Sequence, residues 1–303
     1  MKMKFIFIIA FINMSCHTLQ KIPESKKNNG GLISAIEKKL QTVQGDFALA
    51  FKDLQNGETI YINSKEVFHA ASTMKTPVMI EVFKQVSEGK LSLGDSIIIK
   101  NEFKSIVDGS TYHLDSTSDS QTELYKNIGK KATLYHLLYE MIIASSNLST
   151  NLIIELVDAK KVTQTMRHLG AKDILVLRGV EDGKAYEKGL NNTTTAYDLL
   201  LIFEHIANET AVDKQASDQM IDILSDQKHN EIIPALLPKN IRVAHKTGSI
   251  TGVQHDSGII FLPDGRKYVL VLLSKNLKDE AAGVKVLAEV SRMVFDSVES
   301  HKL

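Results

Sequence analysis

The sequence predicts an α+β fold, because strand-like and helical segments are segregated along the chain. Strand-like runs occur near both ends, at 46–63 and 241–274, and the apolar spacing between them is mostly helical. Such segregation favours an antiparallel sheet over alternating βαβ units. We therefore expect one five-stranded antiparallel sheet made by the two outer parts, with the N- and C-terminal helices on one face and a large all-helical part inserted between the two.

The chain up to about residue 230 carries clear local signals. Apolar residues recur at helical spacing over 31–44 and predict a first helix. Two strand-like runs then flank Asn56-Gly57, a dipeptide typical of β-hairpins. Helical spacing resumes at 71 and continues to about 230, interrupted by polar loops. It is clearest at 132–143, 147–157, 195–207 and 216–224.

The last part of the chain returns to strands. Three runs are predicted, at 241–249, 255–262 and 267–274, followed by an amphipathic helix over 279–298. We expect a single domain over 31–303, with an α/β part (31–66 and 240–303) and a helical part (67–239). The cleft between these parts is the default position of an active site.

Composition narrows the classes of partner. The 303 residues include 36 Lys plus Arg and 36 Asp plus Glu, so the formal net charge is zero. This balance gives no reason to expect a nucleic-acid partner. The ten histidines form no metal-ligand spacing, so we predict no metal. We also predict no other cofactor.

The N-terminus has the layout of an export signal. Two lysines precede a short apolar run and then small residues in "MKMKFIFIIAFINMSC", residues 1–16. The run is shorter than the ~20 apolar residues of a spanning helix. Cys16, the single cysteine, follows the run as in a bacterial lipobox, although Asn13 departs from that pattern. We expect an exported protein, either periplasmic or anchored to the membrane as a lipoprotein through Cys16, with 17–30 as a polar tether. The alternative is an ordinary cleaved signal with an incidental cysteine.

A serine and a lysine three residues apart open the helical part. Ser72 and Lys75 would share one face of a helix turn, where a lysine can activate a serine nucleophile. The same spacing also occurs at Ser87/Lys90 and Ser225/Lys228, so it means little alone.

Two further motifs give it context. Ser145-Ser146-Asn147 stands at the start of a predicted helix, and Lys246-Thr247-Gly248 lies in a predicted strand. Ser-x-Asn also recurs, at Ser149/Asn151 and Ser274/Asn276, whereas Lys-Thr-Gly occurs once. The informative feature is the order of the three motifs along the chain.

With these motifs, residues 31 to 298 resemble a class A β-lactamase-type serine hydrolase, of the serine β-lactamase and penicillin-binding protein superfamily. Further likeness lies in "FHAASTMK" after a hairpin, in "IIPALLP" ahead of "VAHKTGS", and in the closing strand pair and helix. Asn151, four residues after Asn147, selects the Ser145 register over Ser149.

The resemblance implies a role for each motif residue. Ser72 would attack the carbonyl and form an acyl-enzyme, and Lys75 would be its base. A neutral Lys75 requires a fall from a reference pKa of about 10.4 to near 7, at roughly 4 kcal/mol. Burial and the nearby cation of Lys246 would act in that direction. Ser145 would relay a proton to the leaving nitrogen, and Asn147 would hold Lys75 and the substrate amide.

The same resemblance implies the substrate contacts. The backbone N–H groups of Ser72 and Ser249 would form an oxyanion hole. Lys246, Thr247 and Ser249 would bind the substrate carboxylate, and Gly248 would belong to the same substrate-binding segment.

The sequence departs from the family pattern at two places. The middle motif is Ser-Ser-Asn where the family has Ser-Asp-Asn. The loop that carries the deacylating glutamate in class A enzymes offers two candidates, Glu181 and Glu187. We favour Glu181, because its overall position suits the site, whereas Glu187 has only the local Leu-Asn spacing. Asn192 stands where the loop's closing aspartate is expected, so its ion pair with Arg178 would be lost.

Three functions remain open at this stage. The first is a β-lactamase that acylates at Ser72 and deacylates with Glu181. The second is a D,D-peptidase or esterase that acts on an acyl-D-alanyl peptide and deacylates slowly. The third is a β-lactam-binding sensor, which the lack of a second long apolar segment disfavours. In each case the partner is a small-molecule substrate, and the resemblance implies a monomer.

Overall fold

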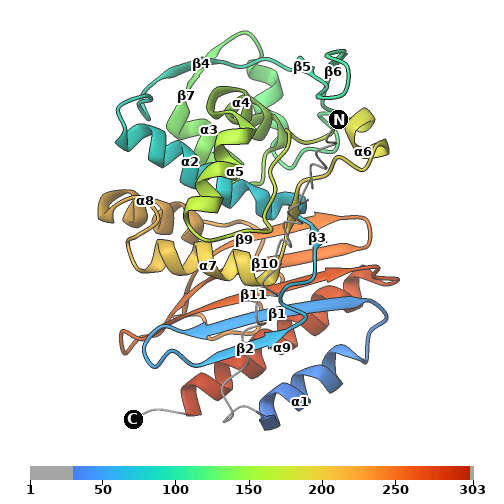
Figure 1. The fold of residues 1–303 in the computed structure, drawn as a ribbon, viewed down its shortest axis with the longest axis vertical. Coiled ribbons are helices and arrows are strands. Elements are labelled where there is room, and N and C mark those ends of the chain that lie inside the picture. Colours follow the sequence, from blue (N-terminus) through green and yellow to red (C-terminus); the bar gives the residue numbers. More distant parts are fainter. Residues whose placement is uncertain (1–29, 301–303) are drawn as a thin grey trace, which may run out of the picture.

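A five-stranded antiparallel sheet forms the lower half of the molecule (Figure 1), in a computed structural model that describes residues 30–300. The strand order is β2-β1-β11-β10-β9, so the two ends of the chain share one sheet, as predicted. The expected signal peptide, Cys16 and nearly all of the expected tether lie outside the described residues. The strands are β1 (Asp46–Asp53), β2 (Thr59–Ile62), β9 (Arg242–Ile250), β10 (Val253–Phe261) and β11 (Lys267–Lys275).

The sheet is covered on both faces, whereas the sequence predicted helices on one face. Alternate residues of β1 and β11 belong to two separate cores. Leu49 and Leu272 face α1 (Gly30–Leu40) and α9 (Glu280–Ser300), while Ala50 and Val271 face α7 (Ala196–Ala207). A strand buried on both faces reads as a continuous apolar run, which explains the lack of alternation in "YVLVLLS".

The first helix ends at Leu40 rather than at 44. The chain must turn there to enter β1, and Thr42 Oγ1 donates to the carbonyl of Lys39 (2.7 Å), which satisfies one of the last helical carbonyls. The hairpin after it is as predicted: β1 pairs with β2 across Asn56-Gly57, and Gly57 has a positive φ of 72°.

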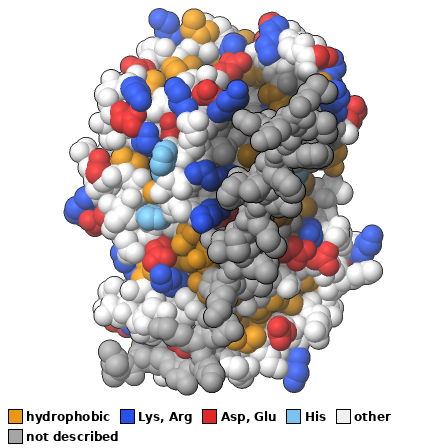
Figure 2. All heavy atoms as spheres, viewed as in Figure 1, with side chains coloured by type: hydrophobic (Ala, Val, Ile, Leu, Met, Phe, Trp, Pro, Cys, Tyr) orange, Lys and Arg blue, Asp and Glu red, His pale blue; other side chains and the backbone are white. Residues whose placement is uncertain are grey.

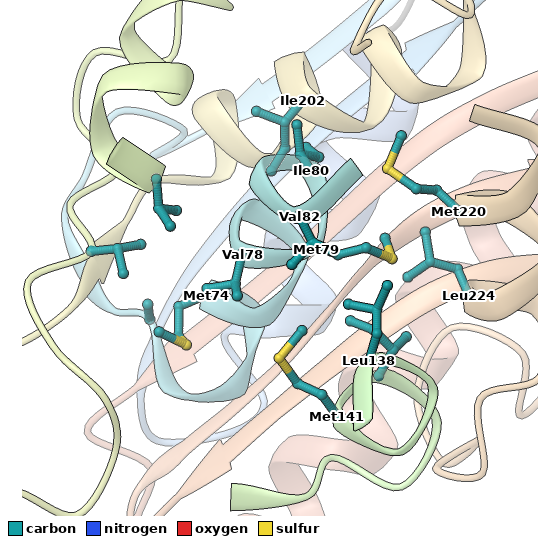
Figure 3. Packing of buried hydrophobic residues seen from close by; sticks show 14 of the residues in the cluster. Met74, Val78, Met79, Ile80, Val82, Leu138, Met141, Ile202, Met220 and Leu224 are labelled. Atoms are coloured by element: carbon teal, nitrogen blue, oxygen red, sulfur yellow. The ribbon is translucent and has the colours of Figure 1, made fainter. Parts of the chain in front are cut away.

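The helical part lies above the sheet and surrounds α2 (Figure 1). Met74, Met141 and Met220 from neighbouring elements pack around this helix, which itself contributes Met79 (Figure 3). The 3₁₀ helix just before α2, Ala71–Met74, lies against β9. Besides α7, the α-helices of this part are α2 (Lys75–Ser87), α3 (Leu134–Ile143), α4 (Asn147–Val157), α5 (Ala159–His168), α6 (Gly183–Glu187) and α8 (Lys214–Ser225).

Short strand pairs that the sequence did not reveal complete this part. They are β3 (Phe68–His69) with β8 (Thr193–Thr194), β4 (Ser96–Ile98) with β7 (Lys131–Thr133), and β5 (Phe103–Lys104) with β6 (Thr111–Tyr112). Two or three residues are too few to show a period.

The surface mixes both signs of charge. Lysines and arginines are interspersed with acidic side chains over the face shown in Figure 2. Among residues 30–300, no helix has the length and apolarity of a membrane span. In the same residues, no three His, Cys, Asp or Glu side chains gather as a metal site would require.

Candidate active site

Ser72 lies on a 3₁₀ helix, Ala71–Met74, that leads directly into α2. The sequence predicted one continuous helix for Ser72 and Lys75, but Lys75 is the first residue of α2. Ala71 has a positive φ of 44°, which is uncommon for a non-glycine residue and sharpens the turn into Ser72. Ser72 therefore lies on the short 3₁₀ helix before α2 and not on α2 itself.

Strand β9 approaches this turn closely at Gly248. A Cβ at Gly248 would lie 3.1 Å from the backbone nitrogens of Ser72 and Thr73. The glycine thus allows the Lys-Thr-Gly strand to lie against the serine, with Thr247 and Ser249 lining the same cavity as Ser72. The two motifs, more than 170 residues apart in the chain, meet here.

Lys75 is fully buried, and its ammonium group is saturated with acceptors. Lys75 Nζ donates to the carbonyl of Ser145 (2.6 Å), to Ser145 Oγ (3.2 Å) and to Asn147 Oδ1 (3.0 Å). No hydrogen bond joins it to Ser72 Oγ among the described residues. Burial lowers the pKa of Lys75 to about 7, and the negative charges of Asp119 and Glu181 oppose that effect. A lysine of this kind is neutral in a large fraction of molecules near neutral pH.

Ser145 links Lys75 to the second lysine of the site. Lys246 Nζ donates to Ser145 Oγ at 3.0 Å, and Lys246 is fully buried. Burial lowers the pKa of Lys246 well below its usual range, and the neighbouring Lys75 lowers it further. Two ammonium groups on one hydroxyl oxygen repel each other, so the pair favours the loss of one proton. The Ser145 oxygen accepts both bonds, which leaves its own proton free for another acceptor.

The connection from α3 to α4 places Ser145 and Asn147. Ser145 has a positive φ of 58°, and Ser146, rather than either motif partner, caps α4 by accepting from the amide of Ser149 (3.2 Å). Asn147 is the first residue of α4. Its Oδ1 faces Lys75, while its Nδ2 donates to Glu181 Oε1 (2.7 Å).

Glu181 therefore reaches the site through Asn147, and Glu187 does not. The φ of Glu181 is 62°, a third positive value beside the cleft. Glu181 lines a cavity of about 370 Å³ that it shares with Ser72. Glu187 is exposed at the end of α6 and lines neither cavity that contains Ser72.

Asn151 holds the segment before Glu181. Its side-chain amide donates to the carbonyl of Val180 (3.1 Å) and accepts from the amide of Val180 (2.6 Å). A Cβ at Gly179 would lie 2.3 Å from Asn151 Oδ1, so only glycine fits there without displacing that contact. Asn151, chosen from the sequence only to set a register, thus anchors the loop.

The sequence predicted that Arg178 would lose its ion pair with the closing residue of the loop. A hydrogen-bond network around Asn192 and Arg178 takes its place. Asn192 accepts from the amides of Leu177 (2.8 Å) and Arg178 (3.2 Å), and donates to the carbonyl of Arg178 (2.9 Å). The buried Arg178 side chain donates to the carbonyls of Leu190 and Gly179, both at 2.9 Å. The two ends of the loop are therefore joined without an aspartate.

Ser72 lies where two cavities meet. The first, also about 370 Å³, is lined by Ser145, Thr247, Ser249 and other polar residues. The second lies below the loop that carries Glu181 and also contains His69 and Tyr186. The first cavity thus joins Ser72 to Ser145, which both lysines contact, and the second joins Ser72 to Glu181.

Sequence reasoning missed two polar residues of the site. Asp119, in the polar loop before the 3₁₀ turn at 122–127, is buried beside the start of α4. Gln254 on β10 donates to Ser249 Oγ (2.9 Å) and lines the first cavity. Neither residue belongs to a motif. For Gln254, the one signal that could have pointed to the site is its pairing with Ser249 across the β9–β10 turn.

The fold and this site define an enzyme of the serine β-lactamase and penicillin-binding protein type. A model of the β-lactamase enzyme family matches residues 31–298, and the chain belongs to that family. It is 22% identical to β-lactamase VEB-1 of Pseudomonas aeruginosa over 284 residues, covering 90% of this chain and 92% of that protein.

Solved structures agree with this assignment. A β-lactamase from Sphaerobacter thermophilus superimposes with a TM-score of 0.78 and 27% identity, over 90% of this chain and 99% of that one. PBP-A superimposes with a TM-score of 0.76 and 25% identity, over 89% and 97%. The predicted α+β fold is thereby confirmed.

Proposed function

We propose that this protein is a class A-like serine β-lactamase that hydrolyses the lactam amide through an acyl-enzyme on Ser72. The observation that carries the proposal is the position of Ser72 between two cavities. One contains Ser145, which both buried lysines contact, and the other contains Glu181. Acylation and hydrolysis need different proton acceptors, and this arrangement offers one on each side of the nucleophile.

In the proposed acylation, Ser72 Oγ bonds to the lactam carbonyl carbon and its proton passes to neutral Lys75. Lys75 must first give up one of its three donated hydrogen bonds, so that its lone pair can accept a hydrogen bond from Ser72 Oγ. The carbon–nitrogen bond then breaks, and the nitrogen takes the Ser145 proton, which Lys75 replaces. A substrate carboxylate on Lys246 and Thr247 would stabilise the charge of Lys246, so that Lys75 is the lysine that gives up its proton.

In the proposed deacylation, Glu181 takes a proton from water as the water oxygen attacks the ester carbonyl. The ester bond to Ser72 breaks, and the proton that Glu181 took from water passes to Ser72 Oγ, which restores both groups. The second cavity provides room for that water between Glu181 and Ser72. Asn147 would keep the carboxylate oriented through its bond to Oε1.

Sustained hydrolysis of a chromogenic cephalosporin tests this function. We expect the purified protein to consume many equivalents. One equivalent followed by a stall would favour the alternative, a slowly deacylating D,D-peptidase or esterase, or a β-lactam-binding sensor. The likeness to PBP-A is the observation that supports this alternative.

The acylation rate should depend on the charge of Lys75. Below pH 7 the lysine is protonated and cannot accept the Ser72 proton, and above pH 7 it is neutral. We therefore expect the rate to rise about tenfold from pH 6 to pH 8 and then to level off. Single-turnover kinetics of adduct formation measures this, with circular dichroism as a control for folding. A flat profile over that range would exclude Lys75 as the base.

We further propose that the protein is exported and is a monomer anchored to the membrane through a lipid on Cys16. The support is the sequence of residues 1–16. Cys16→Ala should move the protein from the membrane fraction to the soluble fraction, measured by immunoblotting of fractionated cells. An unchanged distribution would rule out the anchor.

A further inference from the structure

Asp119 is a buried carboxylate at the start of α4 that no motif accounts for. Its side chain is only 4% exposed. Asp119 Oδ2 accepts from the backbone amides of Asn147 (3.0 Å) and Leu148 (2.9 Å), and from the hydroxyl of Tyr125 (2.9 Å). Asp119 Oδ1 accepts from the amide of Gln121 (3.0 Å). Burying a carboxylate without an ammonium or guanidinium partner costs free energy. Here four hydrogen-bond donors offset that cost.

These contacts fix the position of Asn147, which lies between the proposed base for acylation and the proposed base for deacylation. Asn147 contacts both Lys75 and Glu181 through its side chain, and Asp119 holds its backbone. The helix dipole and the first free amides of α4 favour a negative charge at this point. Ser146 occupies the position where the motif would carry its own carboxylate, and its hydroxyl reaches only the amide of Ser149.

We propose that Asp119 is a positioning residue that supplies, from the loop lining the cleft, the carboxylate that Ser145-Ser146-Asn147 lacks. It acts through Asn147 and through its charge on Lys75, and it does not touch the substrate. The loop places it there because Ser118 and Ser120, on either side, face the cavity that contains Ser72. The inference deepens the proposed function and rests on it for the kinetic part of its test.

The charge of Asp119 gives a second, independent readout. The charged groups around Lys75 are Asp119 from the loop, Glu181 from the opposite loop and Lys246 from β9. Because Asp119 raises the pKa of Lys75 against burial, its loss should lower that pKa below about 7. A carboxylate that did not act on Lys75 through its charge would leave the titration of Lys75 where it is.

The test uses Asp119→Asn, which keeps the shape and removes the charge. We expect acylation at its pH plateau to fall about tenfold or more, since hydrogen bonds to a charged acceptor are the strong ones. We also expect the midpoint of Lys75, followed by NMR of ¹³C-labelled lysine, to move to lower pH; Lys75→Arg identifies the resonance. Asp213→Asn is the matched control, because Asp213 caps α8 through the amide of Ala216 (2.8 Å), away from both cavities.

Exchange of the two side chains completes the test. Asp119→Ser should lose acylation, and the double variant Asp119→Ser with Ser146→Asp should recover most of it and restore the Lys75 midpoint. An unmoved midpoint in Asp119→Asn overturns the inference even if no β-lactam reacts, because the titration needs no substrate. Absence of any adduct on the parent protein would refute the proposed function instead. If the Lys75 midpoint moves in Asp119→Asn but Ser146→Asp does not restore the activity of Asp119→Ser, the proposal that Asp119 replaces the missing carboxylate of the motif is refuted.

Discussion

Ser72→Ala should abolish the covalent adduct with a penicillin. Opening the lactam keeps all of its atoms, so the parent protein should gain the full mass of the penicillin in an acid-quenched sample measured by intact mass spectrometry. Without the Ser72 oxygen no ester can form. We expect hydrolysis to fall by on the order of 10⁶-fold, the scale found when a serine hydrolase loses its nucleophile.

Ser87→Ala is a control with the same substitution in the same motif. Ser87 is followed three residues later by Lys90, but it lies exposed at the end of α2, where its hydroxyl donates to the carbonyl of Lys84 (2.9 Å). This variant should acylate like the parent. An adduct that persists on Ser72→Ala would require another nucleophile, and peptide mapping of the modified residue would identify it.

The contrast between Ser72 and Ser87 shows what sequence can and cannot provide. Both have the same local spacing, and only the order of Ser72, Ser145-x-Asn147 and Lys246-Thr247-Gly248 separated them. That order could be found because each motif is a short local pattern. Likewise, the hairpin at Asn56-Gly57 and the closing strands have strong local signals, so the sheet was predicted correctly from its parts.

The rest depends on contacts between distant segments. Asp119 sits in a loop rich in Ser, Asp and Thr, and nothing in its spacing marks it; it becomes notable only where the fold brings it to the amide of Asn147. The second covered face of the sheet has the same origin, because α7 is far from the strands in sequence. Asn192 was expected only to remove an ion pair, and its amide instead joins the ends of the loop.

Glu181→Gln should separate acylation from deacylation. Glutamine can still accept from Asn147 Nδ2 but cannot take a proton from water, so hydrolysis of the acyl-enzyme should slow by about 10² to 10⁴-fold. Acylation should continue, because the loss of this negative charge makes Lys75 easier to neutralise. A chromogenic cephalosporin should therefore give a burst of one equivalent followed by a slow phase, with the adduct visible by mass spectrometry.

Glu187→Gln is the matched control in the same loop. Its exposed side chain lines neither cavity with Ser72, so turnover should match that of the parent. The reverse result, a burst in Glu187→Gln and normal turnover in Glu181→Gln, would mean that the loop rearranges to bring α6 to the acyl group. If Glu181→Gln slowed the burst and the later phase equally, Glu181 would act in acylation as well as in hydrolysis of the acyl-enzyme.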